Sequence, residues 1–205
     1  VSRRDGSGKM LEIHENSVYD VFNHVAGKLC IFRDVTVERD LEKQIRHSSN
    51  TDFLTGLYNR RCFYQYIHNN RGGRTVSLMY IDLDRFKEVN DTYGHKVGDA
   101  VLVHTADVLR RLFRDDFVAR LGGDEFLVVR LGKCSMDQME QEAEAFLKEM
   151  RTAFLAAEQT VSLSASVGIA QSSDSMVDID ALLQRSDQAL YQAKKAGRSR
   201  YCVYR

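Results

Sequence analysis

The sequence predicts an α+β domain, in which a sheet containing antiparallel strands carries helices on its faces. Two observations predict this class. Strand-like and helix-like segments follow one another in mixed order from Thr51 onward, and the stretch "FVARLGGDEFLVVRL" has the pattern of a hairpin, with two apolar strands around a glycine turn. The chain has 205 residues, of which 43% are hydrophobic, so it suffices for one domain of ordinary size and an appendage.

Residues 1–35 predict a β-hairpin as the first unit. Two strand-like stretches, "MLEIHENSVYDVF" and "KLCIFRDVT", are joined by the turn signal "NHVAG". A two-stranded hairpin is only marginally stable alone, so we expect it to pack on something.

Residues 36–50 predict a helical linker. Val37, Leu41 and Ile45 recur every four residues between charged side chains, which is the pattern of an amphipathic helix. The pattern leaves two alternatives open: the helix pairs with a second copy of the chain as a coiled coil, or it rests on its own domain.

Residues 51–205 predict the main domain, and each element follows from its apolar spacing. The helices have apolar residues three and four positions apart, whereas the strands are short, nearly continuous apolar runs. In chain order we expect a helix at 60–70, a strand at 76–84, helices from about 85 and at 98–113, the hairpin at 117–131, a helix at 136–156, a strand at 161–170, a helix at 181–197 and a strand at 201–205.

Composition narrows the function. Lys plus Arg and Asp plus Glu both number 29, so the zero net charge provides no general field for nucleic acid. No apolar run approaches the roughly 18 residues that span a bilayer, although a membrane anchor upstream of Val1 stays possible. The four cysteines, at 30, 62, 134 and 202, lack metal-ligand spacing and predict reduced thiols in a cytoplasmic protein.

Two acidic pairs carry the predicted chemistry. Asp82 and Asp84 end the run "SLMYIDLD", and side chains two apart on a strand point the same way. Asp124 and Glu125 follow two glycines in the turn of the hairpin, where the glycines alone would also suit an ordinary tight turn. If that turn lies beside the strand end, Asp82, Asp124 and Glu125 converge. Such carboxylates suit Mg²⁺ bound together with substrate phosphates, and two ions bridging a triphosphate would polarise its α-phosphate.

Five motifs along the main domain identify a family resemblance. "TDFLTGLYNRRCF", "IDLDRFKEVNDTYGHKVGDAVL", "LGGDEF", "VSLSASVGIA" and "SDQALYQAKKAGRSR" resemble, in order, the GGDEF family of diguanylate cyclases over residues 51–205. The resemblance implies a central mixed sheet flanked by helices, similar to the palm of polymerases and adenylate cyclases. It also implies condensation of two GTP into cyclic di-GMP and two pyrophosphates, in a homodimer whose two domains face each other.

The resemblance assigns roles to individual residues. It implies two Mg²⁺ or Mn²⁺ ions per active site, held by the side chains of Asp82, Asp124 and Glu125 and the carbonyl of Leu83, with Asp124 also the candidate general base. It implies contacts to guanine from Asn90 and Asp99 and a contact to the substrate from His95. It also implies phosphate contacts from Phe86, Lys87, Lys194 and Arg198, and close backbone approach at Gly122 and Gly123.

Some of these residues have ordinary structural alternatives. Asp99 can accept hydrogen bonds from N1–H and the amine of guanine, but it also suits a helix N-terminus. A loop histidine such as His95 is a plain surface group as often as it is a substrate contact. Lys194 and Arg198, four apart, would share one helical face as a phosphate-binding pair, or simply form a solvated basic helix end.

Two further sites follow from the resemblance. Asp52 and Arg60, in the opening motif, predict a semi-buried tie between the linker and the catalytic domain rather than catalytic groups. An inhibitory product site, Arg-x-x-Asp in many members, reads "FRDD" here: Asp116 fits, but Phe113 occupies the arginine position and Arg114 comes one residue late. One residue turns a helical side chain by about 100°, so we expect a degraded inhibitory site.

The N-terminal region and the activity leave alternatives. "GKLCIFRDVTVERDLEKQI" resembles the end of a PAS sensor domain followed by a signalling helix, whereas the alternative is a plain hairpin packed on its own domain. The rival to an active cyclase is a catalytically silent GGDEF module that binds GTP or partners. A polymerase-like nucleotidyltransferase would need a basic template groove, which the zero net charge does not provide.

Overall fold

The structure, a computed structural model, describes residues 9, 11–37, 50–156, 158–172 and 178–205. The chain divides into two compact units, Val1–Ser49 and Asn50–Arg205. Among the residues described, no helix combines the length and the hydropathy needed to cross a bilayer.

The first unit contains a two-stranded antiparallel hairpin, β1 (Leu11–Tyr19) and β2 (Val25–Asp34). Its turn comes earlier than the predicted signal, because Asp20 Oδ1 accepts hydrogen bonds from the backbone N–H groups of Phe22 and His24, at 2.9 and 2.8 Å. Every residue of β2 is exposed. The predicted linker helix begins at residues 36–37, and its remainder, 38–49, lies outside the described residues.

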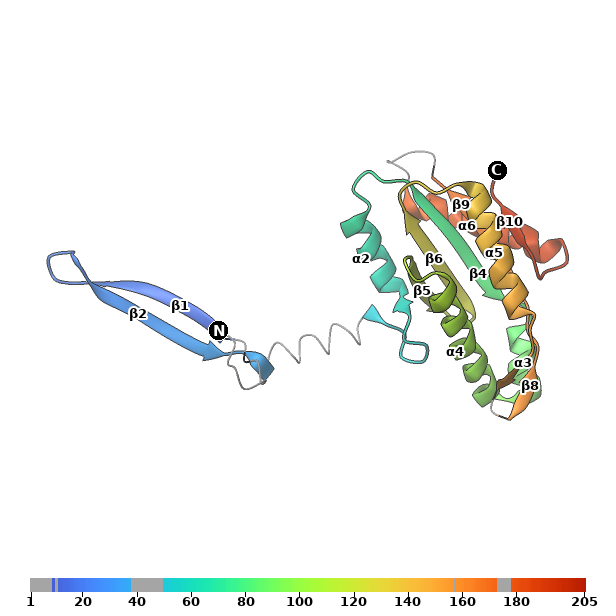
Figure 1. The fold of residues 1–205 in the computed structure, drawn as a ribbon, viewed down its shortest axis with the longest axis horizontal. Coiled ribbons are helices and arrows are strands. Elements are labelled where there is room, and N and C mark those ends of the chain that lie inside the picture. The colour runs from blue at the N-terminus through green and yellow to red at the C-terminus, as the bar shows by residue number, and fades with distance from the viewer. Residues whose placement is uncertain (1–8, 10, 38–49, 157, 173–177) are drawn as a thin grey trace. The chain divides into compact units, whose positions relative to one another are not determined.

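The second unit is built on a six-stranded mixed sheet (Figure 1). The central strand β4 (Val76–Leu83) is buried along nearly its whole length and pairs antiparallel with β6 on one side and β9 on the other. The two outermost pairs, β10 with β9 and β3 with β5, are parallel. The order in space is β10 (Tyr201–Val203), β9 (Ala165–Gln171), β4, β6 (Glu125–Leu131), β5 (Phe117–Gly122) and β3 (Tyr58–Asn59).

Helices cover both faces of this sheet. Alternate side chains of β4 point to opposite faces, so that Met79 and Ile81 pack with α3, α4 and α5, whereas Leu78 and Tyr80 pack with α2 and α6. This arrangement confirms the predicted α+β class with a central mixed sheet flanked by helices. The helices are α2 (Arg60–Asn70), α3 (Phe86–Tyr93), α4 (His95–Leu112), α5 (Met136–Met150) and α6 (Ile179–Lys195).

Several predicted boundaries differ from those in the structure, and the largest differences concern α4, α5 and β9. Helix α4 starts at His95 rather than at 98, because a glycine at positive φ ends α3 just before it. Helix α5 stops at Met150, and the residues after it form β7 (Phe154–Ala156), which pairs with β8 (Gln159–Val161). Strand β9 starts only at Ala165.

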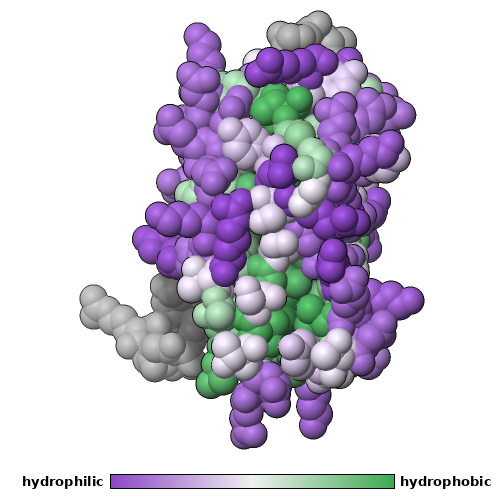
Figure 2. Space-filling model, turned by 90° about the vertical axis from the view of Figure 1, so that its right-hand side faces the viewer, coloured by the Kyte–Doolittle hydropathy of each residue, from purple (hydrophilic) through white to green (hydrophobic). Residues whose placement is uncertain are grey.

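On the face shown in Figure 2, hydrophobic residues gather along the middle between margins of hydrophilic side chains.

Gly168 sets how closely α6 lies on β9. A Cβ added at this position would lie 2.0 Å from the carbonyl oxygen of Ser186 and 2.3 Å from the backbone nitrogen of Leu190. Only glycine leaves room for backbone atoms at that distance. The contact therefore fixes the position of α6, whose last turn carries Lys194 to the end of the sheet.

We predict that Gly168→Ala lowers the free energy of unfolding of the second unit by about 1–3 kcal/mol or more, because the added methyl group must push the α6 backbone away. Denaturant unfolding followed by circular dichroism would measure this free energy. Gly27→Ala is the matched control, since a Cβ at Gly27 meets nothing within 4 Å. Equal stability of wild type and Gly168→Ala would contradict the packing described.

Candidate active site

The predicted acidic residues meet at one end of the central sheet. The register of β4 and β6 places Asp82 directly opposite Glu125, so both side chains lie on the face covered by α2 and α6. The backbone N–H of Leu83 donates to the carbonyl of Asp124 at 3.3 Å, which holds the hairpin turn beside the end of β4. The structure thus brings Asp82, Leu83, Asp124 and Glu125 together.

The turn before Asp124 needs glycine for its conformation and not for its packing. Gly122 and Gly123 have φ values of 147° and 52°, a region that other residues rarely adopt. A Cβ at either position would meet no atom within 4 Å. The space above the turn is therefore open, so a ligand can approach its backbone closely.

Asp82 lies in an electrostatically crowded place. Burial raises its pKa, the hydrogen bond from Lys194 opposes this, and the carboxylates of Asp124 and Glu125 raise the pKa further. The Lys194 ammonium lies 2.8 Å from Asp82 Oδ2. Neighbouring carboxylates disfavour each other's negative charge, whereas a cation between them favours it. The cluster therefore stabilises a bound cation.

Tyr80 is a further residue beside this cluster, and sequence reasoning did not identify it. It precedes Asp82 by two residues and so lies on the same face of β4. Burial, together with the charge and hydrogen bonding of Glu125, raises its pKa to about 12. The apolar run that predicts β4 also contains this tyrosine, but its partner follows only from the register of β6.

The donors at this site fit a hard divalent cation. Within the ranges that the structure describes, no three His, Cys, Asp or Glu side chains are close enough to hold a metal by themselves. Mg²⁺ does not need such a cage, since it is usually bound by one or two carboxylates together with substrate phosphates and water. Asp82 opposite Glu125, with Asp124 in the adjoining turn, matches that pattern.

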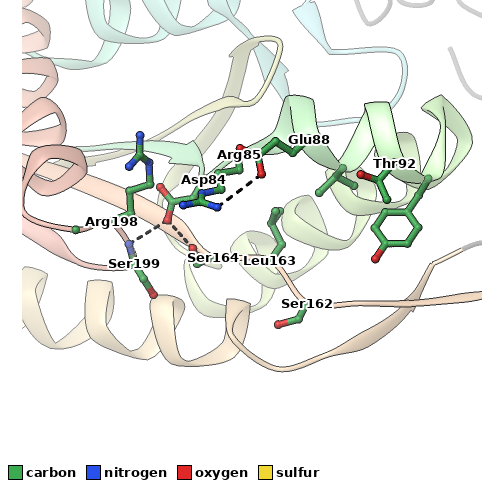
Figure 3. A pocket seen from close by; sticks show the side chains of 12 residues that line it. Asp84, Arg85, Glu88, Thr92, Ser162, Leu163, Ser164, Arg198 and Ser199 are labelled. Carbon is green, nitrogen blue, oxygen red and sulfur yellow. Dashed lines mark hydrogen bonds and ion pairs between the residues drawn. The ribbon is translucent and has the colours of Figure 1, made fainter.

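Asp84 has a different role from the one its spacing suggests. It is 5% exposed, and it accepts hydrogen bonds from the Ser164 hydroxyl at 2.6 Å and the Ser166 hydroxyl at 2.7 Å. Its Oδ2 also accepts from the backbone N–H of Ser199 at 3.0 Å (Figure 3). These donors fix Asp84 as a structural anchor, so it is not paired with Asp82 at the cation site.

The expected pairing of Lys194 with Arg198 on one helical face is wrong. Helix α6 ends at Lys195, and Arg198 lies in the following turn with φ 60°. Lys194 contacts Asp82, whereas Arg198 lines a cavity beside Asp84. Lys194 and Arg198 therefore do not share a helical face.

The residues expected at guanine lie where α3 meets α4. The Asn90 side chain packs against Gly98, where an added Cβ would lie 1.9 Å from Asn90 Oδ1. Asn90 is thus placed next to the residue that precedes Asp99. The remaining predicted contact residues are exposed or half-buried on these helices: Phe86 and Lys87 in the first turn of α3, and His95 and Asp99 in the first two turns of α4.

The predicted tie in the opening motif exists, but with another partner. Asp52 pairs with Arg120 at 3.0 Å and not with Arg60. Arg120 also donates two hydrogen bonds to the carbonyl of Gly123, at 3.0 and 2.7 Å. Arg60 instead lies 3.8 Å from Glu125. One guanidinium thus joins the opening motif to the turn that carries Asp124.

The region of the inhibitory motif contains no free arginine–aspartate pair at the expected register. Phe113 is 2% exposed and belongs to the core, whereas Arg114 is exposed. Asp116 accepts hydrogen bonds from Arg130 at 2.8 and 2.5 Å, and Arg130 also pairs with Glu142 at 3.0 Å. Asp116 is therefore already held by a residue that sequence reasoning missed.

We predict that Asp52→Asn lowers the free energy of unfolding by about 1–3 kcal/mol at neutral pH, because Arg120 loses its charged partner. Burial alone would raise the pKa of Asp52, but the Thr55 donors and Arg120 lower it overall. The stabilisation is therefore complete above about pH 4 and is lost as the pH falls through the lowered pKa.

Denaturant unfolding at pH 7 and pH 3 would measure both effects. Asp107→Asn is the matched control, because Asp107 pairs with Arg110 at an exposed position and should cost below about 1 kcal/mol. Equal costs for the two variants at pH 7 would contradict the assignment.

Comparison with known proteins places this site in a family. The family model described as "Diguanylate cyclase, GGDEF domain" matches residues 49–200. Cyclic di-GMP phosphodiesterase PdeR of Escherichia coli K12 is 38% identical over 180 residues, which are 86% of this chain and 27% of that protein. Diguanylate cyclase DgcM of the same strain is 37% identical over 178 residues, 84% of this chain and 42% of that protein. The chain thus spans less than half the length of either relative.

Solved structures agree with this placement. The coiled coil and GGDEF domain of DgcB from Caulobacter crescentus, in complex with c-di-GMP, has a TM-score of 0.76 and 28% identity, covering 82% of this chain and 93% of that one. Diguanylate cyclase SiaD with its activator SiaC, from Pseudomonas aeruginosa, has a TM-score of 0.70 and 32% identity, covering 82% of this chain and 66% of that one. With its acidic cluster beside a glycine turn, its mixed sheet and these matches, the chain belongs to the GGDEF-domain family of diguanylate cyclases.

Proposed function

We propose that this chain condenses two GTP molecules into cyclic di-GMP and two pyrophosphates. The observation that carries the proposal is the meeting of Asp82, Asp124 and Glu125 at one end of the sheet, with the Lys194 ammonium 2.8 Å from Asp82. Carboxylates gathered beside an open glycine turn favour chemistry on a phosphate group over a purely structural hairpin.

The proposed reaction is a phosphoryl transfer that occurs twice. The 3′ oxygen of one nucleotide bonds to the α-phosphorus of the other, the bond from that phosphorus to the oxygen bridging to the β-phosphate breaks, and pyrophosphate leaves with that oxygen and its electron pair. The hydroxyl proton passes to Asp124 or to solvent. The second transfer closes the ring.

The acidic residues and the Leu83 carbonyl would hold two Mg²⁺ or Mn²⁺ ions. When bound, these ions supply charge neutralisation and polarisation of the α-phosphate. Asp82 and Glu125 face each other across two strands, so the sheet fixes their separation before any ligand arrives. The Lys194 ammonium, which lies at Asp82, would neutralise negative charge on the α-phosphate.

The remaining predicted residues would bind the nucleotide. Asp99 would accept from N1–H and the amine of guanine, whereas adenine has no N1–H, so ATP would be rejected. The placement of Asn90 on Gly98 supports a joint role for Asn90 and Asp99. His95 would contact the base nearby. We assign the phosphates to Phe86, Lys87, Lys194 and Arg198, and close backbone approach to Gly122 and Gly123.

A homodimer is part of the proposal. One chain carries one such site, and a symmetric product requires two nucleotides that face each other. The N-terminal hairpin and linker would regulate this pairing as the tail of a PAS-like sensor. The exposed side chains of Ile31 and Phe32 support a sensor role, because they need a further surface to cover them. Since GTP is the substrate, we place the protein in the cytoplasm.

A silent GGDEF module is the second candidate function. It is favoured by one specific observation, namely that a protein named as a cyclic di-GMP phosphodiesterase is 38% identical to this chain. The intact acidic cluster and Lys194 favour the active cyclase instead, since a silent module does not require either.

Incubation of the dimeric protein with GTP and Mg²⁺, followed by chromatography for cyclic di-GMP, tests the function. We expect Asp82→Asn and Asp124→Asn to lower the rate at least about a hundredfold, because each removes a carboxylate that stabilises transition-state charge. Asp137→Asn, at an exposed position in α5, is the matched control and should keep the wild-type rate. Absence of product from a demonstrated dimer would exclude the cyclase, and full activity of Asp124→Asn would exclude the site assignment.

We also expect no tight inhibition by added cyclic di-GMP, because Phe113 is buried in the core and Asp116 is held by Arg130. Initial rates measured over a range of product concentrations would test this. Tight inhibition that is relieved by Arg114→Gln, and not by the control Arg111→Gln, would mean that the offset arginine still serves an inhibitory site.

A further inference from the structure

The turn that follows α6 has a strained backbone. Gly197, Arg198 and Ser199 have φ values of 111°, 60° and 52° in succession. Glycine adopts such values freely, whereas the arginine and the serine carry a conformational cost there. A strained conformation of this kind persists only where its surroundings hold it. The contacts of this turn therefore decide whether Arg198 keeps its place.

Ser199 is held at three of its atoms by two other segments. Its backbone N–H donates to Asp84 Oδ2 at 3.0 Å (Figure 3). Its hydroxyl oxygen accepts from Arg151 Nε at 2.9 Å, and its carbonyl oxygen accepts from Arg151 Nη2. The guanidinium of Arg151 thus binds both oxygens of Ser199 at once, which the planar fork of an arginine allows and a lysine does not.

Arg151 reaches this turn from the end of a different helix. It follows Met150, the last residue of α5, which is 1% exposed in the core, so the backbone of Arg151 is anchored. Its other contact, with Glu144 at 3.7 Å, joins two side chains that are 45% and 57% exposed and contributes little. Arg198 and Ser199 line the cavity beside Asp84, whereas Arg151 stands behind them and does not line it.

The remaining backbone contacts fix the two ends of the turn. The N–H of Arg198 donates to a carbonyl of α6 at 3.1 Å, and the carbonyl of Arg200 accepts from a backbone N–H of β9 at 3.0 Å. Between these points, Arg151 orients the carbonyl of Ser199. Removal of the guanidinium would therefore free the middle of the turn while both ends stay in place.

We infer that Arg151 is a positioning residue for nucleotide binding, which holds the turn 197–199 in the conformation that presents Arg198. The inference rests on the proposed function, which gives Arg198 its contact with the substrate. Arg151 acts through Arg198 and not on the nucleotide. Without it, the turn relaxes toward ordinary φ values, and the guanidinium of Arg198 moves out of place.

Binding of 3′-deoxy-GTP to the full chain in the presence of Mg²⁺, measured by calorimetry, tests this inference without turnover, because the nucleotide lacks the attacking hydroxyl. We expect Arg151→Gln to weaken binding roughly three- to tenfold. Arg151→Lys should recover only part of the loss, since an ammonium offers no planar fork. The matched control is Arg111→Gln, which should bind as wild type, because Arg111 joins α5 to another helix through Glu149 at an exposed position.

A double-mutant cycle separates positioning from a merely structural role. Its second member is Arg198→Asn, since asparagine tolerates positive φ. If Arg151 acts through Arg198, Arg151→Gln should add less than about twofold to the loss in the Arg198→Asn background. Equal binding by wild type and Arg151→Gln, or full and independent losses from the two substitutions, would overturn the inference.

Kinetics distinguish this inference from the proposed function. During cyclic di-GMP formation, Arg151→Gln should raise the KM for GTP roughly three- to tenfold and leave kcat within about twofold of wild type, because the acidic cluster is untouched. Product formation with an unchanged KM would overturn the positioning role and keep the cyclase. Binding of 3′-deoxy-GTP that depends on Arg151, without any cyclic di-GMP formation from GTP, would overturn the cyclase and keep the positioning role.

Discussion

The antiparallel register of β4 and β6 is the constraint on which the site depends. It sets Asp82 directly opposite Glu125, although like charges facing each other across two strands are unfavourable. The apolar residues that precede Asp82 on β4 and follow Glu125 on β6 are buried on both faces, so the sheet holds the register regardless. The acidic cluster therefore exists because the core imposes it, and not because its members attract one another.

Lys194 relieves this repulsion, and its own position depends on packing elsewhere. Helix α6 lies so close to β9 that its backbone occupies the space of a side chain at Gly168. The ammonium reaches Asp82 from the last turn of that helix. A single glycine in the middle of β9 thus affects the charge balance at the end of β4 through the position of α6.

The sequence was sufficient for the features that follow from periodicity and from local motifs. The central strands and the glycine turn follow from apolar runs that are bounded by acids. The meeting of Asp82 with Asp124 and Glu125 was expected only if the turn lay beside the end of β4, and the register of β4 and β6 supplies that condition. Asp84 was harder, because its partners come from β9 and from the turn after α6, and strand pairing is needed to find them. Arg198 was misplaced because helical spacing was extended past Lys195, where the helix stops. The Asp52–Arg120 pair joins residues 68 positions apart, a separation at which no local pattern applies.

The Asp52–Arg120 contact has a mechanical consequence. Asp52 is among the first residues after the linker, and the same guanidinium that it binds also holds the Gly123 carbonyl at 2.7 Å. Hydrogen bonds weaken when they leave their preferred range of distance and angle, so Arg120 cannot keep both partners if they move apart. If the chain changes direction at Asp52, the glycine turn must therefore move with it, or the hydrogen bonds of Arg120 must break. The arginine works as a stiff link between the entrance of the domain and the loop that carries Asp124.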